Sequence, residues 1–234
     1  SRTEPLSGDG RRCIVLSRDI TQRKHDALNL QKALNEKVGL LNEVHHRVKN
    51  NLQVIASLLR LEANRSVQVE TQSVLGEMQG RIRSMALLHE SLYRTGTFAS
   101  VELGAYLQQL CLQAFRTGAQ QTEGVRLITD LAVVQVTMDQ ATPCGLLVNE
   151  LISNCLKHGF PQGRTGEVRV ALAPTEDHQW AISVSDNGVG LPSDFESRLG
   201  ASLGLQLVTD LTRQLGARLV VGPGPGATFT IIFT

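Results

Sequence analysis

Residues 43–61 (EVHHRVKNNLQVIASLLRL) contain two adjacent histidines whose surroundings suit nucleophilic chemistry. An imidazole has an ordinary pKa of ~6.5, so it is mostly neutral near pH 7 and can attack an electrophile without special tuning. Glu43 lies three residues before His46 and therefore shares its side of a helix. Lys49 and Asn50 follow His46 by three and four residues and share that side too. The segment predicts a reactive imidazole with an acid, a cation and an amide within reach.

A helical seam separates the two histidines. Apolar residues recur at alternating intervals of four and three from Leu34 to Leu59, which is typical of a helix that packs against another helix. His45 falls on this seam, whereas His46 points about 100° away from it. We therefore expect His45 to face another helix and His46 to be accessible. A solvated surface role is the alternative for such a pair of histidines.

Three stretches in the second half of the chain carry residues suited to bind a nucleotide. In the first, residues 149–158 (NELISNCLKH), one helical face carries Glu150, Asn154, Lys157 and His158. A carboxylate, an amide and a cation along one face suit a hydrated Mg²⁺ that bridges phosphates, because Mg²⁺ prefers oxygen ligands and retains waters. Solvated surface is the other explanation of this face.

The other two stretches are rich in glycine. Residues 186–192 (DNGVGLP) follow a predicted strand, and Asp186 at its end can accept a hydrogen bond from an adenine amino group. Residues 200–205 (GASLGL), with Gly204 and Leu205, form a turn that opens a helix and so offers N–H groups to phosphate. Each stretch alone also fits an ordinary turn, but the order of the three along the chain is far more specific.

Composition restricts the class of protein and its partners. The 234 residues are 41% hydrophobic with a formal net charge of +1, which fits one or two globular domains and gives no reason to expect nucleic acid or an anionic membrane as a partner. No apolar run approaches the ~20 residues of a membrane span, and the beginning of the chain lacks the pattern of a signal peptide. The spacing of the cysteines favours buried thiols in a reducing cytosol over a metal site or disulfides, so we expect a cytoplasmic protein. These cysteines are Cys13, Cys111, Cys144 and Cys155.

The first half of the chain is predicted to be largely helical. A short strand at residues 12–17 precedes a helix expected from residue 22 to about residue 64. The alternation of three and four resumes from Leu75 to Leu92, with His89 on the seam in a hydrogen-bonded packing role. The two helices should form an antiparallel hairpin, and two copies of that hairpin would close a four-helix bundle.

A second domain of the α+β class, with helices on one face of a sheet, is predicted to begin near residue 100. Pro143 is expected in the first turn of its second helix. The predicted helices cover residues 101–116, 139–158 and 203–215, and the predicted strands cover residues 124–131, 132–137, 167–173, 180–185, 218–221 and 227–233.

The three stretches resemble the N, G1 and G2 boxes of the ATP-binding domain shared by sensor histidine kinases, gyrase, Hsp90 and MutL. With HHRVKNNLQ upstream, the chain resembles sensor histidine kinases whose phospho-acceptor helix carries H-R-V-K-N, from Asp19 onward. The resemblance implies a two-component kinase that binds ATP and Mg²⁺, phosphorylates its own histidine, passes the phosphoryl group to a response-regulator receiver domain and forms a homodimer. It assigns His46 as phospho-acceptor, Asn154 as Mg²⁺ ligand beside Glu150, Asp186 as adenine reader and Gly188, Gly190 and Gly204 as loop glycines.

The same resemblance divides the chain into four parts. Residues 1–18 would be the end of a PAS-type sensor, because residues 18–24 (RDITQRK) resemble the D-I-T exit of PAS domains. Residues 19–42 would form a signalling coiled coil whose rotation regulates the kinase. Residues 43–95 would form the dimerisation and phosphotransfer hairpin. Residues 96–234 would form the catalytic ATP-binding domain.

The chain departs from related kinases at several positions. The neighbouring HWE group has a His before the N-box Glu and a W-x-E motif, whereas this chain has Asn149 and residues 180–182 (WAI), which places it in the related H-R-V-K-N group. The commonest kinases have an acid after the phospho-acceptor, but here Arg47 follows, so the acid/base partner of His46 stays open. The spacing from Gly190 to Gly200 predicts a short lid over the nucleotide.

The expected roles of the residues around His46 follow from their chemistry. Glu43 could hold the second imidazole nitrogen, Lys49 or Arg47 could neutralise phosphate charge, and Asn50 could position water for dephosphorylation. Two other classes of protein fit parts of the chain. One is a non-catalytic scaffold that relays phosphate or dimerises, and the other is a protein-serine kinase of the anti-sigma type, which shares the ATP domain.

Overall fold

The structure is a computed structural model that describes residues 21–95, 100–118, 124–192, 195, 203–222 and 226–234. The predicted strand at residues 12–17 and the proposed sensor remnant therefore lie outside the described residues, as do residues 200–202 of the third nucleotide stretch. The chain divides into two compact units, residues 1–44 and residues 45–234. We describe the two units separately.

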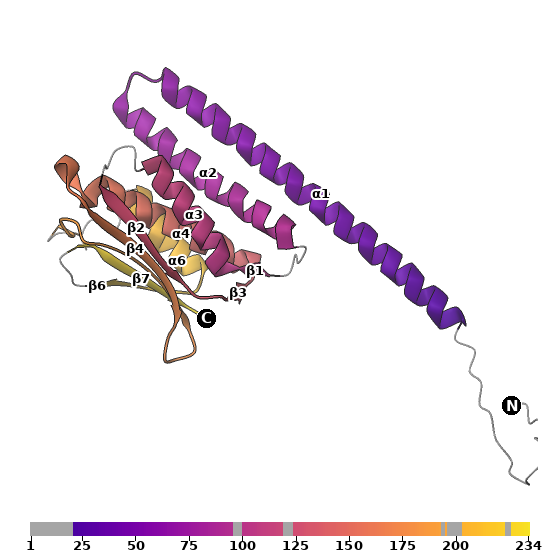
Figure 1. Ribbon diagram of the computed structural model, residues 1–234. Helices are drawn as coiled ribbons and strands as arrows, with labels where there is room; N and C mark the ends of the chain where they lie inside the picture. Colours follow the sequence, from indigo (N-terminus) through magenta and orange to yellow (C-terminus); the bar gives the residue numbers. More distant parts are fainter. Residues whose placement is uncertain (1–20, 96–99, 119–123, 193–194, 196–202, 223–225) are drawn as a thin grey trace, which may run out of the picture. The chain divides into compact units, whose positions relative to one another are not determined.

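A long helix and its partner form the hairpin that was expected in the first half. Helix α1 (Thr21–Arg65) and helix α2 (Val69–Thr95) are joined by a three-residue turn (Figure 1). The predicted helix over residues 22–64 is confirmed to within one residue at each end. Within the second unit the helices are tied by the Gln79 side chain, whose Nε2 donates to the Ala56 carbonyl at 3.0 Å.

The part of α1 in the first unit exposes the apolar residues of its seam. Leu34 and Leu41 of the seam are exposed there. Because a sustained seam of this kind is stabilised only by burial against another helix, we expect a partner helix along residues 21–44.

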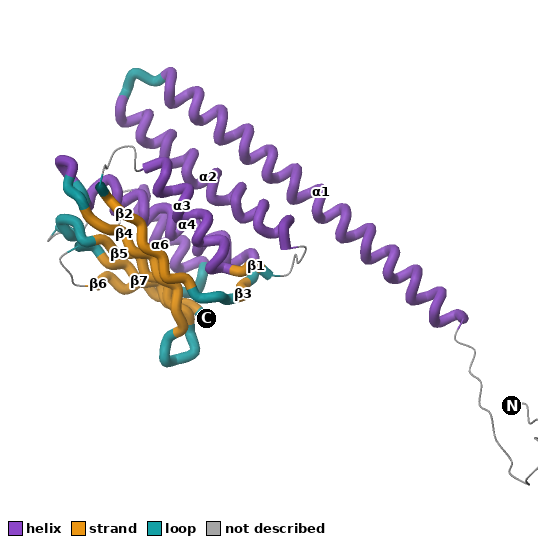
Figure 2. The backbone as a smooth tube through the Cα atoms, in the orientation of Figure 1, coloured by secondary structure: helices purple, strands orange, loops and turns teal. Residues whose placement is uncertain are grey.

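The remainder of the second unit is a mixed five-stranded sheet with helices α3 (Leu103–Gly118), α4 (Met138–Asn154) and α6 (Leu203–Gln214) on one face (Figures 1 and 2). The strand order is β2-β4-β5-β7-β6, with β2 and β4 parallel and the other neighbours antiparallel. The core between sheet and helices is apolar, which confirms the predicted α+β class. The strands are β2 (Val125–Leu131), β4 (Gly166–Pro174), β5 (Trp180–Asp186), β6 (Arg218–Gly222) and β7 (Thr228–Phe233).

Two predictions near the start of this domain were wrong. Helix α3 begins at Leu103, because the two residues before it form strand β1 (Val101–Glu102), which pairs with β3 (Gln135–Val136). The Glu102 carboxylate accepts hydrogen bonds from the first N–H groups of α3 and so fixes where the helix starts. The strand predicted over residues 132–137 is limited to β3, because only the two residues of β3 pair with β1.

Helix α4 also differs from its prediction at both ends. Thr137 and Gln140 form a capping box, so the helix starts at Met138 and Pro143 lies inside it rather than in the first turn. The α-helix ends at Asn154, and residues Cys155–Gly159 continue as a π-helical turn. This wider turn presents the Gly159 carbonyl to the N–H of Val189 at 2.9 Å, a bond between two of the predicted nucleotide stretches.

Candidate active site

His45 on α1 and His89 on α2 meet between the two helices. Their Nδ1 atoms are 3.0 Å apart, and the ring centroids are 5.2 Å apart. Burial lowers the pKa of His89, and the neighbouring His45 lowers it further. The seam prediction for both histidines is confirmed, and the pair holds α1 against α2 directly beside His46.

His46 is exposed, as the helical register predicted, and its Nδ1 lies 3.2 Å from Nδ2 of Asn50. Lys49 turns instead to α2, where its Nζ is 3.0 Å from Oε2 of Glu90. Glu43 is exposed on the part of α1 that belongs to the first unit. The structure thus brings the expected amide of Asn50 against Nδ1 of this imidazole.

The predicted N-box face of α4 divides in two. Glu150 is buried, with 3% of its surface exposed, and its carboxylate accepts two hydrogen bonds from Arg81 of α2, at 2.7 and 3.0 Å. The hydrogen bond with Glu150 raises the pKa of Arg81 above its ordinary value. Lys157 forms an ion pair with Glu77 of α2. Asn154 is half-buried at the end of α4, and His158 is exposed.

The second stretch forms a close junction with the π-helical turn. Asp186 ends β5 and is 9% exposed, and its Oδ1 accepts hydrogen bonds from the N–H groups of Gly188 at 2.8 Å and Ala227 at 3.3 Å. A Cβ on Gly159 would lie 3.3 Å from the Asp186 carboxyl carbon, and one on Gly188 would lie 2.2 Å from the Gly159 carbonyl oxygen. Gly188 therefore has no room for a side chain, and a Cβ on Gly159 would require the Asp186 carboxyl group to shift by a few tenths of an ångström.

The remaining loop residues occupy the positions that the motifs predicted for glycine. Gly190 has φ of +80°, a left-handed conformation that favours glycine. A Cβ on Gly204, in the first turn of α6, would lie 3.3 Å from Oε2 of Glu150. Leu205 follows it in the same turn and is half-buried. The three stretches are thus brought together around the end of α4.

This junction has a donor set that fits a purine nucleotide. The oriented carboxylate of Asp186 can accept from an exocyclic amine, and the glycines let a flat base approach the backbone. Among the described residues no group of three or more His, Cys, Asp or Glu side chains is placed to hold a metal ion. While both Glu150 oxygens accept from Arg81, a Mg²⁺ ion here would depend on Asn154 together with phosphate oxygens and water, which is how Mg²⁺ commonly binds in nucleotide enzymes.

Several residues of this region were not identified from the sequence. Cys155 packs against Asp186, and burial together with that carboxylate raises the pKa of its thiol. The thiols of Cys111, Cys144 and Cys155 are buried, as predicted, and burial raises the pKa of Cys111 and Cys144 to about 12. Cys13 lies outside the described residues. One feature of the sequence could have indicated the close contacts of Gly159, namely that this glycine directly follows the K-H pair of the N-box.

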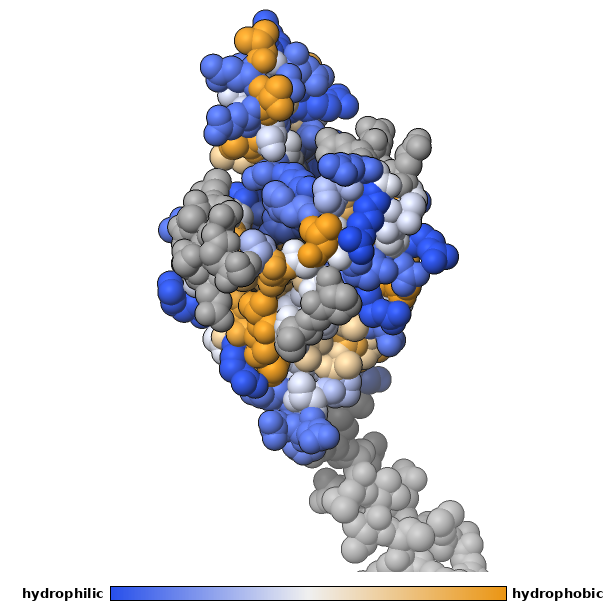
Figure 3. All heavy atoms as spheres, turned by 90° about the vertical axis from the view of Figure 1, so that its left-hand side faces the viewer, coloured by the Kyte–Doolittle hydropathy of each residue, from blue (hydrophilic) through white to orange (hydrophobic). Residues whose placement is uncertain are grey.

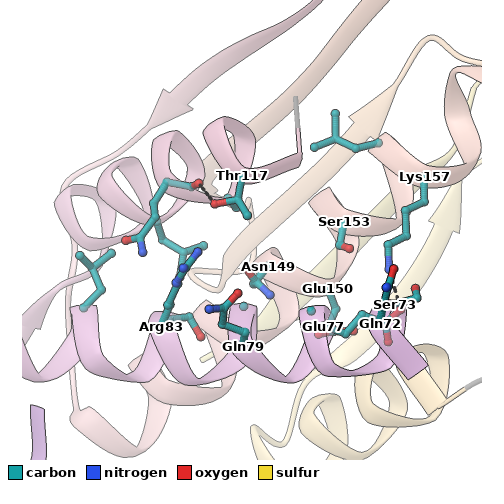
Figure 4. A pocket seen from close by; sticks show the side chains of 18 of the residues that line it. Gln72, Ser73, Glu77, Gln79, Arg83, Thr117, Asn149, Glu150, Ser153 and Lys157 are labelled. Atoms are coloured by element: carbon teal, nitrogen blue, oxygen red, sulfur yellow. Dashed lines mark hydrogen bonds and ion pairs between the residues drawn. The ribbon is translucent and has the colours of Figure 1, made fainter. Parts of the chain in front are cut away.

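A cavity of about 430 Å³ lies between α2, α3 and α4 (Figure 4). Asn149, Glu150, Ser153 and Lys157 line it from α4 and the turn that follows. Asn154 and Asp186 do not line it, so the cavity is on the α2 side of α4, where it shares Glu150 and Lys157 with the predicted nucleotide-binding face. Figure 4 shows Lys157 and Glu77 reaching toward each other at one end of it.

Two family matches cover most of the chain. Residues 43–117 match the family described as histidine kinase, and residues 139–234 match the family described as histidine kinase-, DNA gyrase B- and HSP90-like ATPase. Within the described residues, no helix is both long and apolar enough to cross a membrane.

Individual relatives agree with the family matches. Sensor histidine kinase PdtaS of Mycobacterium tuberculosis is 34% identical over 90% of this chain and 41% of its own length. Blue-light-activated histidine kinase 2 of Erythrobacter litoralis is 30% identical over 82% of this chain and 56% of its own. The chain therefore spans about half the length of the curated relatives it matches.

Solved structures give the same result. The structure of the Erythrobacter litoralis EL346 blue-light activated histidine kinase is 28% identical, with a TM-score of 0.63 over 83% of this chain and 58% of that one. Its isolated histidine kinase domain superposes with a TM-score of 0.64 over 85% of this chain and 94% of that one, at 24% identity, which supports the shared fold. The chain therefore belongs to the histidine kinase family, with the histidine kinase match at residues 43–117 followed by the matched ATPase domain at residues 139–234.

Proposed function

We propose that this core transfers the γ-phosphoryl group of ATP to His46 and then to an aspartate of a response-regulator receiver domain. The observation that carries the proposal is the exposed imidazole of His46, held at Nδ1 by Asn50 on the hairpin that matches the histidine kinase family. In the same unit of the chain, Asp186 and the neighbouring glycines form a junction that suits adenine.

The transfer step requires one tautomer of His46. Nε2 attacks the γ-phosphorus with its lone pair while the bond from phosphorus to the bridging oxygen breaks, and ADP leaves with that electron pair. Nδ1 carries the ring proton during the attack and releases it afterwards, so that the phosphoimidazole is neutral at the ring. Asn50 favours this tautomer when its side-chain oxygen, rather than its nitrogen, faces Nδ1, which needs only a flip of the amide.

The remaining site residues are assigned by their chemistry. Asn154, with Glu150 as a second oxygen donor, would hold Mg²⁺, which neutralises phosphate charge during the transfer when it is bound. Lys157 and His158 would contact phosphate, as would the first turn of α6 at Gly204 and Leu205. Lys49 and Glu43 would act on His46 from its own helix. Asn50 would also orient water for the reverse dephosphorylation.

The exposed apolar side chains of the hairpin support a homodimer. Ile55, Leu58 and Leu61 of α1 are exposed, and Figure 3 shows apolar side chains at the tip of the hairpin among polar ones. A second hairpin would bury these residues in a four-helix bundle. In this arrangement residues 43–95 dimerise and carry the phosphoryl group, residues 96–234 bind ATP, and residues 1–18 and 19–42 are the end of a PAS-type sensor and a signalling helix.

The test is incubation of the purified chain with γ-labelled ATP and Mg²⁺, followed by acid or base. Phosphohistidine is lost in acid and survives base, so the label should behave in this way in the wild-type chain. His46→Gln should take up no label. His25→Gln is the matched control, because His25 lies on the same helix with Asn29 at 3.1 Å in the same spacing, and it should label normally.

Other outcomes would overturn the proposal. Label that survives acid would indicate a protein-serine kinase, and no label in the wild-type chain would indicate a scaffold. Full labelling of His46→Gln would show that another residue accepts the phosphoryl group.

A further inference from the structure

Helix α2 presents two charged side chains of opposite sign to α4. Glu77 and Arg81 are four residues apart and therefore lie on one face of α2. Arg81 donates through Nε and Nη2 to the two oxygens of Glu150, while Lys157 donates to Oε1 of Glu77 at 2.5 Å (Figure 4). The two pairs have opposite polarity, so only one register of α2 along α4 satisfies both.

The contact between the two helices is close as well as charged. A Cβ on Gly80 of α2 would lie 3.4 Å from the side-chain nitrogen of Asn149 on α4, so the backbone of α2 approaches α4 at the level of the pairs. Glu150 is almost completely buried there, and a buried carboxylate is strongly destabilising when it lacks a partner. Glu150 is therefore held by Arg81 as long as α2 stays in place.

We propose that Glu77 and Arg81 form a latch that competes with the Mg²⁺-nucleotide for Glu150 and Lys157. The inference rests on the proposed function, in which both α4-side residues serve the nucleotide. A Mg²⁺ ion on the Glu150 carboxylate would stand within a few ångströms of the Arg81 guanidinium, and like charges at such distances repel. Lys157 would have to exchange the carboxylate of Glu77 for phosphate in the same way.

The competition has a consequence for regulation. If docking of α2 weakens nucleotide binding, nucleotide binding must weaken docking of α2 by the same factor. A movement of the hairpin that breaks the two pairs would then release Glu150 and Lys157 together, because both partners lie on one face of one helix. Glu77 and Arg81 would act on the reaction through Glu150 and Lys157 without touching the substrate.

A reversible crosslink tests the latch in the complete chain. The variant carries Gly80→Cys and Asn149→Cys, which introduce one thiol on each side of the contact, in a Cys13→Ser background. The three described native cysteines are buried and should not compete with the new pair. In the oxidised variant, the affinity for a fluorescent ATP analogue with Mg²⁺ should fall by about fivefold or more, and reduction with dithiothreitol should restore it. Equal affinity in both redox states would overturn the latch.

Single substitutions that remove one partner of each pair test whether release of α2 strengthens nucleotide binding. Arg81→Gln should raise nucleotide affinity by about fivefold or more, and Glu77→Gln by a smaller factor because its pair is more exposed. Arg83→Gln removes a cation from the same helix outside the two pairs and is the matched control, with no change expected. Circular dichroism and thermal melts establish that each variant is folded.

The outcomes separate the latch from the proposed function. Normal labelling of His46 together with equal affinities in Arg81→Gln, Glu77→Gln and the control would overturn the latch alone. Absence of acid-labile label in the wild-type chain would overturn the proposed function, whatever the affinities are.

Discussion

The hairpin and the ATP-binding domain bury their apolar residues to very different extents. In the domain, Leu103, Leu147 and Ile182 are completely buried, as befits a core enclosed by its own sheet and helices. In the hairpin, Leu88 is buried but Ile55 and Leu58 are 44% and 60% exposed. The domain is thus complete within one chain, whereas the hairpin has an apolar surface that only another chain or segment can cover.

The two regions also place their reactive groups differently. Asp186 is buried and oriented by backbone N–H groups, so it can only serve a ligand that enters its junction. His46 is exposed, and Asn50 of the same helix lies against its Nδ1. This difference suits the proposed function, in which the nucleotide site must be preorganised and His46 would have to reach the nucleotide and then a receiver domain.

The largest effect should come from the core of the domain. Leu147→Ala should lower the free energy of unfolding by ~2–5 kcal/mol, because it leaves a cavity in a fully enclosed site. Leu58→Ala, the matched change on the hairpin, should lower stability only to the extent that it weakens association. Urea unfolding at several protein concentrations distinguishes them, since the loss at Leu58 should depend on concentration. Equal, concentration-independent losses would remove the contrast between the two regions.

An intermediate effect is expected at the nucleotide junction. Asp186→Asn should weaken binding of a fluorescent ATP analogue by roughly 10- to 100-fold, because a hydrogen bond to a charged group is replaced by one to a neutral amide. His46→Gln should change the affinity for this analogue by no more than about twofold. The hairpin that carries His46 is proposed to supply the phospho-acceptor and not the nucleotide site. A similar loss of affinity in both variants would mean that the hairpin contributes directly to nucleotide binding.

The smallest effect concerns the pair of imidazoles between α1 and α2. Burial lowers the pKa of His89 in the folded chain below its ordinary value of ~6.5, so the folded state binds fewer protons than the unfolded state as the pH falls through that range. Stability of the hairpin should therefore be full above pH ~6.5 and should decline as the pH falls through the folded pKa. Thermal melts between pH 7.5 and pH 5 measure it.

A matched substitution assigns this pH dependence. His89→Gln should flatten the decline, whereas His25→Gln, at an exposed position of α1, should leave it unchanged. Lys49 and Glu90 form an ion pair one turn away, and both substitutions leave this pair in place. An unchanged decline in His89→Gln would assign it to other groups.

The periodic parts of the sequence were predicted well because they depend on local geometry. The seam of α1 placed His45 toward a neighbouring helix and His46 in solvent, and both placements are confirmed because a helix fixes side-chain directions by sequence spacing alone. The family and its ATP-binding domain followed from the order of short motifs, and the family matches confirm them.

The tertiary structure alone determined which residues that are far apart in the sequence contact one another. The sequence placed Glu150 and Lys157 on one polar face of the helix predicted over residues 139–158. No local pattern could show that Arg81 and Glu77, some seventy to eighty residues earlier, would pair with them. The pairing of β1 with β3 and the contact of Cys155 with Asp186 were hidden for the same reason. Spacing along a helix determines which way a side chain points, whereas the packing of separate elements determines what it meets there.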